Sequence, residues 1–169
     1  MSVALEMARH VAPDTKEEFQ SEYLQALRLI ERLHRLLLDV IKNEFDRNGG
    51  SDLNSVQALL LYNIGDSILT AGELKSRGYY LGSNVSYNLK KLVDMGYIDC
   101  KQSETDGRSK RVSLTDKGLK ASEIVKNLYH RQLGSIETVG EVRNDDLARL
   151  NKALVRLERF WTDQVRYQL

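Results

Sequence analysis

Apolar residues recur at intervals of three and four near the start of the chain, which predicts an amphipathic helix from about Thr15 to Asn48. Its apolar positions are Phe19, Tyr23, Ala26, Leu27, Ile30, Leu33, Leu37, Val40, Ile41 and Phe45. Gly49 and Gly50 end it, because glycine readily adopts the left-handed geometry of a helix terminus. At roughly 50 Å, this helix is longer than a small domain can cover, so part of its apolar stripe needs another partner.

The remaining pattern predicts a mainly helical chain with one β-hairpin. We expect helices over 54–63, 70–78, 83–96 and 116–133 and from 145 onward, a short strand at 68–69, and strands near 97–103 and 110–115. Thr70 and Glu73 have the spacing of a capping box, in which each side chain accepts a backbone N–H of the other residue. Asp116 is expected to cap the helix that follows the hairpin.

The predicted hairpin carries charge around its tip. Asp106-Gly107 is a strong signal for a two-residue turn, because a type I′ turn needs positive φ at both central positions. Alternation along the strands places four residues on the inner face: Ile98, Cys100, Val112 and Leu114. Cys100 is therefore expected to be a core-facing strand residue. The basic residues near the tip are Arg108, Lys110 and Arg111.

The helix predicted over 83–96 has two contrasting faces. Its buried face is expected to hold Val85, Leu89, Leu92 and Val93. The opposite face holds Ser83, Asn84, Ser86, Tyr87, Lys90 and Lys91. Short polar side chains can reach base edges in the DNA major groove, while lysines neutralise phosphates. Taken alone, the same face also fits an ordinary solvated helix surface.

The order of elements favours the DNA interpretation. A short helix, a turn and an amphipathic helix form a helix-turn-helix, whose second helix lies in the major groove. The basic hairpin after it is then a wing that reaches the adjacent minor groove, where negative potential attracts arginine. Arg108 is the expected minor-groove residue, with Asp106 holding its guanidinium, and Lys110 and Arg111 are expected on the DNA backbone.

Charge is distributed unevenly although the net charge is only +1. Residues 1–69 hold 7 Lys/Arg and 11 Asp/Glu, residues 70–120 hold 10 and 6, and residues 121–169 hold 8 and 7. The positive balance therefore coincides with the predicted helix-turn-helix and wing, which indicates a polyanionic partner. A solvated basic surface is the alternative interpretation.

Composition excludes several other classes. The single cysteine rules out an internal disulfide framework, and no apolar run approaches the roughly 20 residues that a membrane span requires. We therefore expect a cytoplasmic protein with no membrane partner. His10, His34 and His130 lack metal-ligand spacing, and no catalytic or phosphate-binding motif is present. We expect no metal, no cofactor and no enzyme activity.

Two segments identify a family resemblance. "DGRSKRVSLTDKG" resembles the wing of MarR-family bacterial transcription regulators, in which Asp-x-Arg is followed by Leu-Thr-x-x-Gly, here Asp106, Arg108, Leu114, Thr115 and Gly118. "SNVSYNLKKLVDMGYI" is similar to the recognition helix of that family and its exit. The resemblance implies a winged helix-turn-helix on a helical dimerisation frame. It also implies a homodimer, a palindromic operator and, often, repression relieved by a small ligand.

Periodicity independently favours a dimer. The last predicted helix has an apolar stripe formed by Leu147, Leu150, Leu154, Leu157, Phe160 and Trp161. Packing this stripe and that of the first helix across a two-fold axis would bury both, whereas the alternative is a monomeric bundle. We therefore expect a tail over 1–14, a dimerisation region over 15–50 and 119–169, and a DNA-binding domain over 51–118.

The resemblance also implies a ligand pocket beside the dimerisation helices. Its candidate lining residues are Arg28, Arg32, His34 and Tyr62; each also fits an ordinary surface or interface position. Two rival functions stay open: a winged-helix module that binds an acidic protein, and a ligand-binding or structural helical dimer that never binds DNA.

Overall fold

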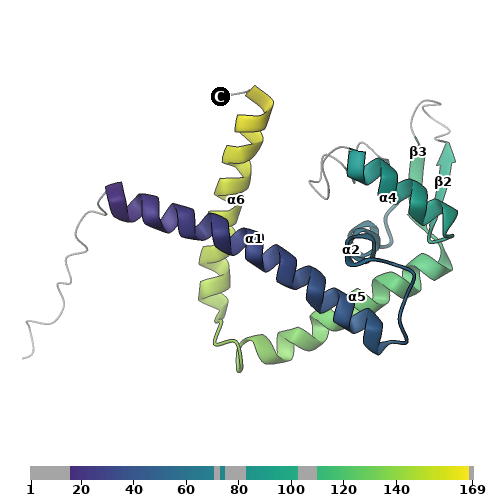
Figure 1. Cartoon of the computed structure of the whole chain (residues 1–169), viewed down its shortest axis with the longest axis horizontal. Coiled ribbons are helices and arrows are strands. Elements are labelled where there is room, and N and C mark those ends of the chain that lie inside the picture. Colours follow the sequence, from purple (N-terminus) through teal and green to yellow (C-terminus); the bar gives the residue numbers. More distant parts are fainter. Residues whose placement is uncertain (1–15, 71–72, 75–82, 103–109, 168–169) are drawn as a thin grey trace, which may run out of the picture. The chain divides into compact units, whose positions relative to one another are not determined.

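The computed structural model describes residues 16–70, 73–74, 83–102 and 110–167, with the backbone alone for 83–85 and 110. Its elements are α1 (Lys16–Arg47), α2 (Ser55–Ile64), β1 (Leu69–Thr70), α4 (Ser83–Asp94), β2 (Ile98–Gln102), β3 (Lys110–Leu114), α5 (Asp116–Ile136) and α6 (Asn144–Tyr167) (Figure 1). This order confirms the predicted fold class. Residues 73 and 74 are helical, as expected for the third helix, and residues 71–72 and 75–78 of that prediction lie outside the described ranges. The chain divides into two units, Met1–Leu59 and Leu60–Leu169.

α1 ends where the glycine pair predicts. Gly49 and Gly50 have φ values of +94° and +77°, in the left-handed region that favours glycine. The Gly50 N–H donates to the Phe45 carbonyl at 3.0 Å, which satisfies a carbonyl of the last helical turn. The Asn48 side-chain amide donates to the Glu44 carbonyl at 2.8 Å. Local chemistry therefore closes the helix within one residue of the predicted end.

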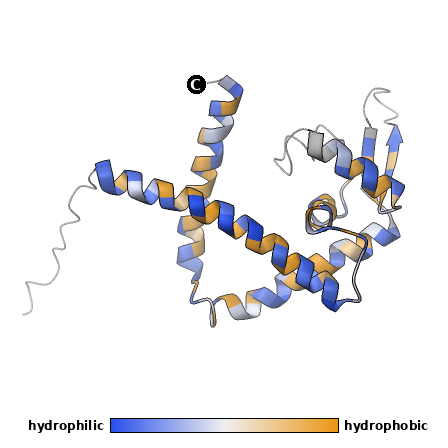
Figure 2. Ribbon diagram, in the orientation of Figure 1, coloured by the Kyte–Doolittle hydropathy of each residue, from blue (hydrophilic) through white to orange (hydrophobic). Residues whose placement is uncertain are grey.

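The apolar stripe of α1 is buried only toward its C-terminal end. Ile41 and Phe45 are 0% and 6% exposed, whereas Phe19 and Leu33 are 69% and 58% exposed. Figure 2 shows apolar and polar residues interleaved along the helix. A helix of 32 residues thus leaves much of its predicted stripe at the surface, as its length led us to expect.

α2 begins with a reciprocal pair of hydrogen bonds. The Gln57 N–H donates to Asn54 Oδ1 at 2.8 Å, and the Asn54 N–H donates to Gln57 Oε1 at 3.1 Å. Such a capping box stabilises a helix start by about 1 kcal/mol. Asn54 is therefore the N-cap of α2.

The three strands form one antiparallel sheet in the order β1-β3-β2. β2 and β3 pair from Ile98↔Leu114 to Gln102↔Lys110. This register sets Cys100 opposite Val112, two of the residues predicted to share the inner face. The turn predicted at Asp106-Gly107 lies outside the described residues.

The apolar core of the second unit lies between its helices and the sheet. α4 contacts β2, and α5 contacts β3. The buried apolar residues of this unit are Leu60, Leu61, Ile64, Leu69, Leu74, Leu89, Leu92, Tyr97, Ile98, Val112, Ala121, Val125 and Leu128. β1 covers Leu69–Thr70, one residue later than predicted, and Ile68 is 65% exposed. The core therefore fixes the recognition helix and the wing strands in one packed body.

Two residues predicted to be buried are exposed. Cys100 is an exposed free thiol, and the side chain of Val93 is 37% exposed. Both line a groove of about 630 Å³ between α4 and the wing strands, together with Ser86, Leu89, Lys90, Gln102 and Val112. The core-facing prediction for Cys100 is wrong because alternation assigns a residue to a face, whereas a neighbouring element decides whether that position is covered.

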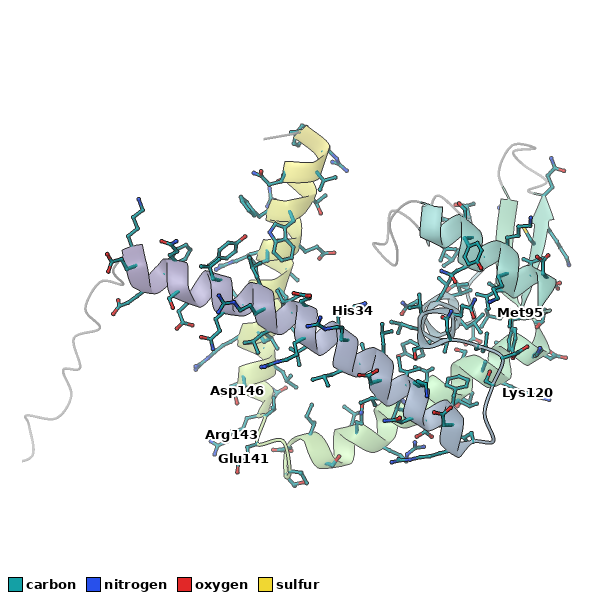
Figure 3. All side chains as sticks on the ribbon, viewed as in Figure 1. His34, Met95, Lys120, Glu141, Arg143 and Asp146 are labelled. Carbon is teal, nitrogen blue, oxygen red and sulfur yellow. The ribbon has the colours of Figure 1, made fainter. Side chains whose placement is uncertain are left out.

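The last two helices also start slightly differently from the prediction. Thr115, not Asp116, is the N-cap of α5, and its hydroxyl accepts the Gly118 N–H at 3.1 Å. α6 begins at Asn144, one residue early, and the Arg143 N–H donates to Asp146 Oδ2 at 3.1 Å (Figure 3). Both shifts are of the one-residue size that competing cap residues produce.

Candidate nucleic-acid interface

α4 presents a polar face next to the wing. Ser86, Tyr87, Lys90 and Lys91 are exposed, and Tyr87 is 66% exposed, whereas Leu89 is buried on the other face. Ser83 and Asn84 form the first turn of the α4 backbone. The described side chains of the predicted recognition face therefore lie on the exposed side of α4, as the helical wheel predicts.

The helix that precedes α4 starts with the predicted capping box. The Thr70 N–H donates to Glu73 Oε2 at 2.6 Å, and the Glu73 N–H donates to Thr70 Oγ1 at 3.1 Å. Leu74, which follows at once, is 0% exposed and anchors this helix in the core. These contacts fix the beginning of the helix-turn-helix.

α4 ends in a turn that leads directly into the wing. The Tyr97 N–H donates to the Leu92 carbonyl at 2.9 Å, and Gly96 has a φ of +75°. This is the pattern of a glycine-terminated helix, in which a residue beyond the glycine satisfies a carbonyl of the last turn. β2 starts at the next residue, Ile98, so no flexible linker separates the recognition helix from the wing.

The paired strands β2 and β3, here called the wing stem, carry basic residues on their outer face. Lys101 lies opposite Arg111 in the β2–β3 register, and both side chains are exposed. Lys110 lies in the first position of β3, and Asp106 and Arg108 lie outside the described residues. Sequence reasoning missed Lys101, because the pairing that sets it opposite Arg111 is visible only in the structure.

The Leu-Thr-x-x-Gly segment joins the wing to α5. The Thr115 hydroxyl donates to the Gly96 carbonyl at 2.7 Å, and the Thr115 N–H donates to the Tyr97 carbonyl at 3.1 Å. Gly118 lies so close to Tyr97 that a Cβ there would collide with the Tyr97 carbonyl oxygen. Thr115 and Gly118 therefore have a structural role, since they hold the exit of α4 against the start of α5.

A second cavity, of about 660 Å³, lies between the end of α2 and the first turns of α5. It is lined by Tyr62, Asn63, Gly65, Asp66, Leu119, Lys120, Ser122, Glu123 and Lys126. The Tyr62 ring meets the Tyr129 ring edge-on with centroids 5.0 Å apart, and burial raises the pKa of the Tyr129 hydroxyl. Of the four predicted pocket residues, only Tyr62 lines this cavity.

The other three predicted pocket residues lie elsewhere. Arg28, Arg32 and His34 are exposed on α1 and line neither this cavity nor the groove beside α4. Figure 3 shows His34 on α1. Among the residues that the structure describes, no group of three or more His, Cys, Asp or Glu side chains could hold a metal ion. Nor does any described helix have the length and apolar character to cross a membrane.

A helix-turn-helix that runs directly into a two-stranded wing defines a winged-helix DNA-binding module. Residues 53–118 match the family model described as a winged helix DNA-binding domain. The chain is also 35% identical over 148 residues to the exopolysaccharide II synthesis transcriptional activator ExpG of Rhizobium meliloti (strain 1021). That alignment covers 86% of this chain and 74% of the activator.

Solved structures of transcription regulators share the fold over about four fifths of this chain. A mutant MarR from E. coli in complex with operator DNA has a TM-score of 0.63 and 21% identity, covering 80% of this chain and 95% of that one. The regulator PcaV from Streptomyces coelicolor, in complex with its natural ligand, has a TM-score of 0.61 and 18% identity, covering 79% and 89%. The chain belongs to the MarR family of winged helix-turn-helix transcription regulators.

Proposed function

We propose that this regulator binds a specific DNA sequence as a homodimer on an inverted-repeat operator. The observation that carries the proposal is the pair formed by Lys101 and Arg111, two exposed cations directly opposite each other on the outer face of the wing strands. Like charges at opposed strand positions destabilise a sheet. A phosphate backbone along the wing stem would offset that repulsion, whereas a neutral partner would not.

Each part of the interface has a role in this proposal. Ser83, Asn84, Ser86 and Tyr87 read base edges in the major groove, and Lys90 and Lys91 neutralise phosphates. Arg108, held by Asp106, enters the minor groove. Lys110 and Arg111 contact the backbone, and Lys101 adds a third cation to the wing stem.

Dimerisation is proposed from the apolar surface of α1 and α6. Leu150, Phe160 and Val165 of α6 are 49%, 52% and 75% exposed, although the helix is amphipathic. Residues 15–50 and 119–169 form the dimerisation region in this proposal, residues 51–118 form the DNA-binding domain, and residues 1–14 are a tail. Two recognition helices about 34 Å apart would meet successive major grooves on one face of the duplex.

A small ligand is proposed to modulate binding from the cavity that Tyr62 lines. The cavity volume of about 660 Å³ falls within the range of about 300–1,000 Å³ typical of small-molecule sites. The structural similarity to PcaV in complex with its natural ligand supports this proposal. The protein is placed in the cytoplasm, together with the DNA that it regulates, and no catalytic function is proposed.

Two directions of control are supported by different observations. The resemblance to the MarR family as a whole supports repression that the ligand relieves. The 35% identity to a transcriptional activator supports activation. A reporter gene behind the operator, measured with and without the protein, distinguishes them: expression falls for a repressor and rises for an activator.

The test of DNA recognition is a titration of the protein against genomic fragments that include the region upstream of its own gene. Random duplex is the competitor, and the salt concentration is varied. A retained fragment that footprints as an inverted repeat, with affinity falling log-linearly with salt, supports the proposal. Binding to an acidic protein instead would favour the interaction-module rival. Absence of duplex affinity at low salt would favour a helical dimer without DNA binding.

A further inference from the structure

Residues 115–118, here named the capping segment, cover the carbonyl groups at the exit of α4. The Met95 carbonyl accepts a hydrogen bond from Lys117 Nζ at 3.1 Å. The next two carbonyls, of Gly96 and Tyr97, accept from the Thr115 hydroxyl and the Thr115 N–H. Each of these three consecutive carbonyls beyond the recognition helix therefore accepts its own hydrogen bond from the capping segment. That segment lies about twenty residues later in the sequence.

Lys117 is held by two contacts of different kinds. Carbonyls at a helix C-terminus carry partial negative charge, so a nearby ammonium group is stabilising. Lys117 Nζ also lies 4.0 Å from the centre of the Tyr97 ring, in cation–π geometry. Tyr97 is 5% exposed and is therefore fixed in the core. Both contacts attach the ammonium to residues that connect α4 to the wing.

The capping segment sits where three elements meet. Ile98 begins β2 and pairs with Leu114 at the end of β3, so the base of the wing lies beside the exit of α4. α5 begins at Asp116, inside the capping segment. Figure 3 shows Met95 at this exit, near the start of α5. These contacts therefore add to the apolar core in holding α4 against the wing and α5.

We propose that Lys117 is a positioning residue for DNA recognition, which acts by capping the exit of α4 and makes no contact with DNA. This inference rests on the proposed function. Without the Lys117 ammonium group, the exit of α4 adopts several placements. Operator binding then has to select the placement that fits α4 to the major groove and the wing to the minor groove. Random duplex, held mainly through phosphates, does not require that joint fit.

The experiment compares Lys117→Met with the wild type in operator and random-duplex titrations over a range of salt concentrations. Methionine keeps the apolar stem and removes the charge and the donors. We expect operator affinity to fall about tenfold, because each protomer loses one cap and one cation–π contact. We also expect unchanged affinity for random duplex and an unchanged salt slope. Lys117→Arg, which keeps both a cation and donors, should restore operator affinity.

Two controls distinguish the positioning role of Lys117 from a general effect of removing one positive charge and from a loss of protein stability. Lys16→Met removes the same charge from the start of α1 and should leave both affinities unchanged. Hydrogen exchange of the Gly96 and Tyr97 amides should be faster in Lys117→Met, while the melting temperature stays near that of the wild type. This exchange measurement tests the cap even without DNA.

Two results would overturn the inference. If Lys117→Met lowers operator and random affinity equally and reduces the salt slope by about 0.9 per contact, Lys117 is a phosphate contact. Unchanged operator affinity would show that the cap does not position the helix. If the wild type itself fails to select any fragment, the proposed function fails, and that result is distinct from both of these.

Discussion

The exit of α4 and the helix α6 differ in how far their apolar side chains are buried and their polar groups are hydrogen-bonded within the chain. Around the exit, Leu92 and Ile98 are 0% and 2% exposed, and consecutive carbonyls are hydrogen-bonded within the same chain. α6, whose 24 residues are all described, has no buried residue despite its apolar stripe. The winged-helix part is completed by its own chain, whereas in the proposed dimer the frame is completed by a second copy.

The largest expected effect comes from blocking the apolar face of α6. Phe160→Glu places a charge on this face, where Phe160 is 52% exposed. We expect a folded monomer by sedimentation and circular dichroism. Operator affinity should fall by at least about 1,000-fold, because two half-sites are then bound independently.

Val155→Glu is the matched control, since Val155 is 62% exposed in the same helix but lies outside its apolar stripe. It should stay dimeric with unchanged affinity. A Phe160→Glu variant that remains dimeric would move the interface away from α6 and weaken the contrast between the two regions.

The next effect concerns the wing alone. Arg108→Ala should reduce operator affinity roughly 100-fold while the dimer stays intact, because each of two protomers loses a minor-groove contact. Fluorescence anisotropy with labelled operator measures the affinity, and sedimentation checks the dimer. Unchanged binding would remove the wing from the interface and leave α4 as its only DNA-reading element.

A third prediction tests how tightly the exit of α4 is packed. Gly118→Ala would place a Cβ on the Tyr97 carbonyl oxygen, in a region that has no space for it. We expect a loss of about 2–3 kcal/mol in unfolding free energy, measured by urea denaturation. Gly134→Ala, in the same helix with open space around it, is the control and should be neutral or slightly stabilising.

The smallest expected effect distinguishes base readout from phosphate contact. Asn84→Ala should relax base preference at one symmetric pair of operator positions, by about 1–3 kcal/mol per contact. Selection from a randomised operator library measures this preference. An equal loss across all sequences would reassign Asn84 to the phosphate backbone.

Local signals were sufficient for most of the fold and for part of the site. The capping box at Thr70 and the glycine end of α1 form as expected. Such features depend on residues within about four positions of each other, so the sequence contains all the interacting partners. The amphipathic face of α4 was predictable for the same reason, apart from the partly exposed Val93.

Long-range contacts explain what the sequence did not show. Cys100 lies on the predicted face of β2, yet it borders an open groove, because coverage depends on the path of α4. The same limit applies to Lys117, which looked like an ordinary surface lysine until folding brought it to Met95, 22 residues away. It also applies to Tyr62, whose cavity is formed with residues of α5.

The sequence by itself determined the element order, the capping box at Thr70, the glycine end of α1, the polar face of α4 and the family of this protein, since each depends on short-range spacing. Only the tertiary structure decided the register of the wing, the residues that border its groove and the cap on the exit of α4. The physical reason is that short-range patterns specify which groups an element presents, whereas burial and capping depend on what another part of the chain places against them.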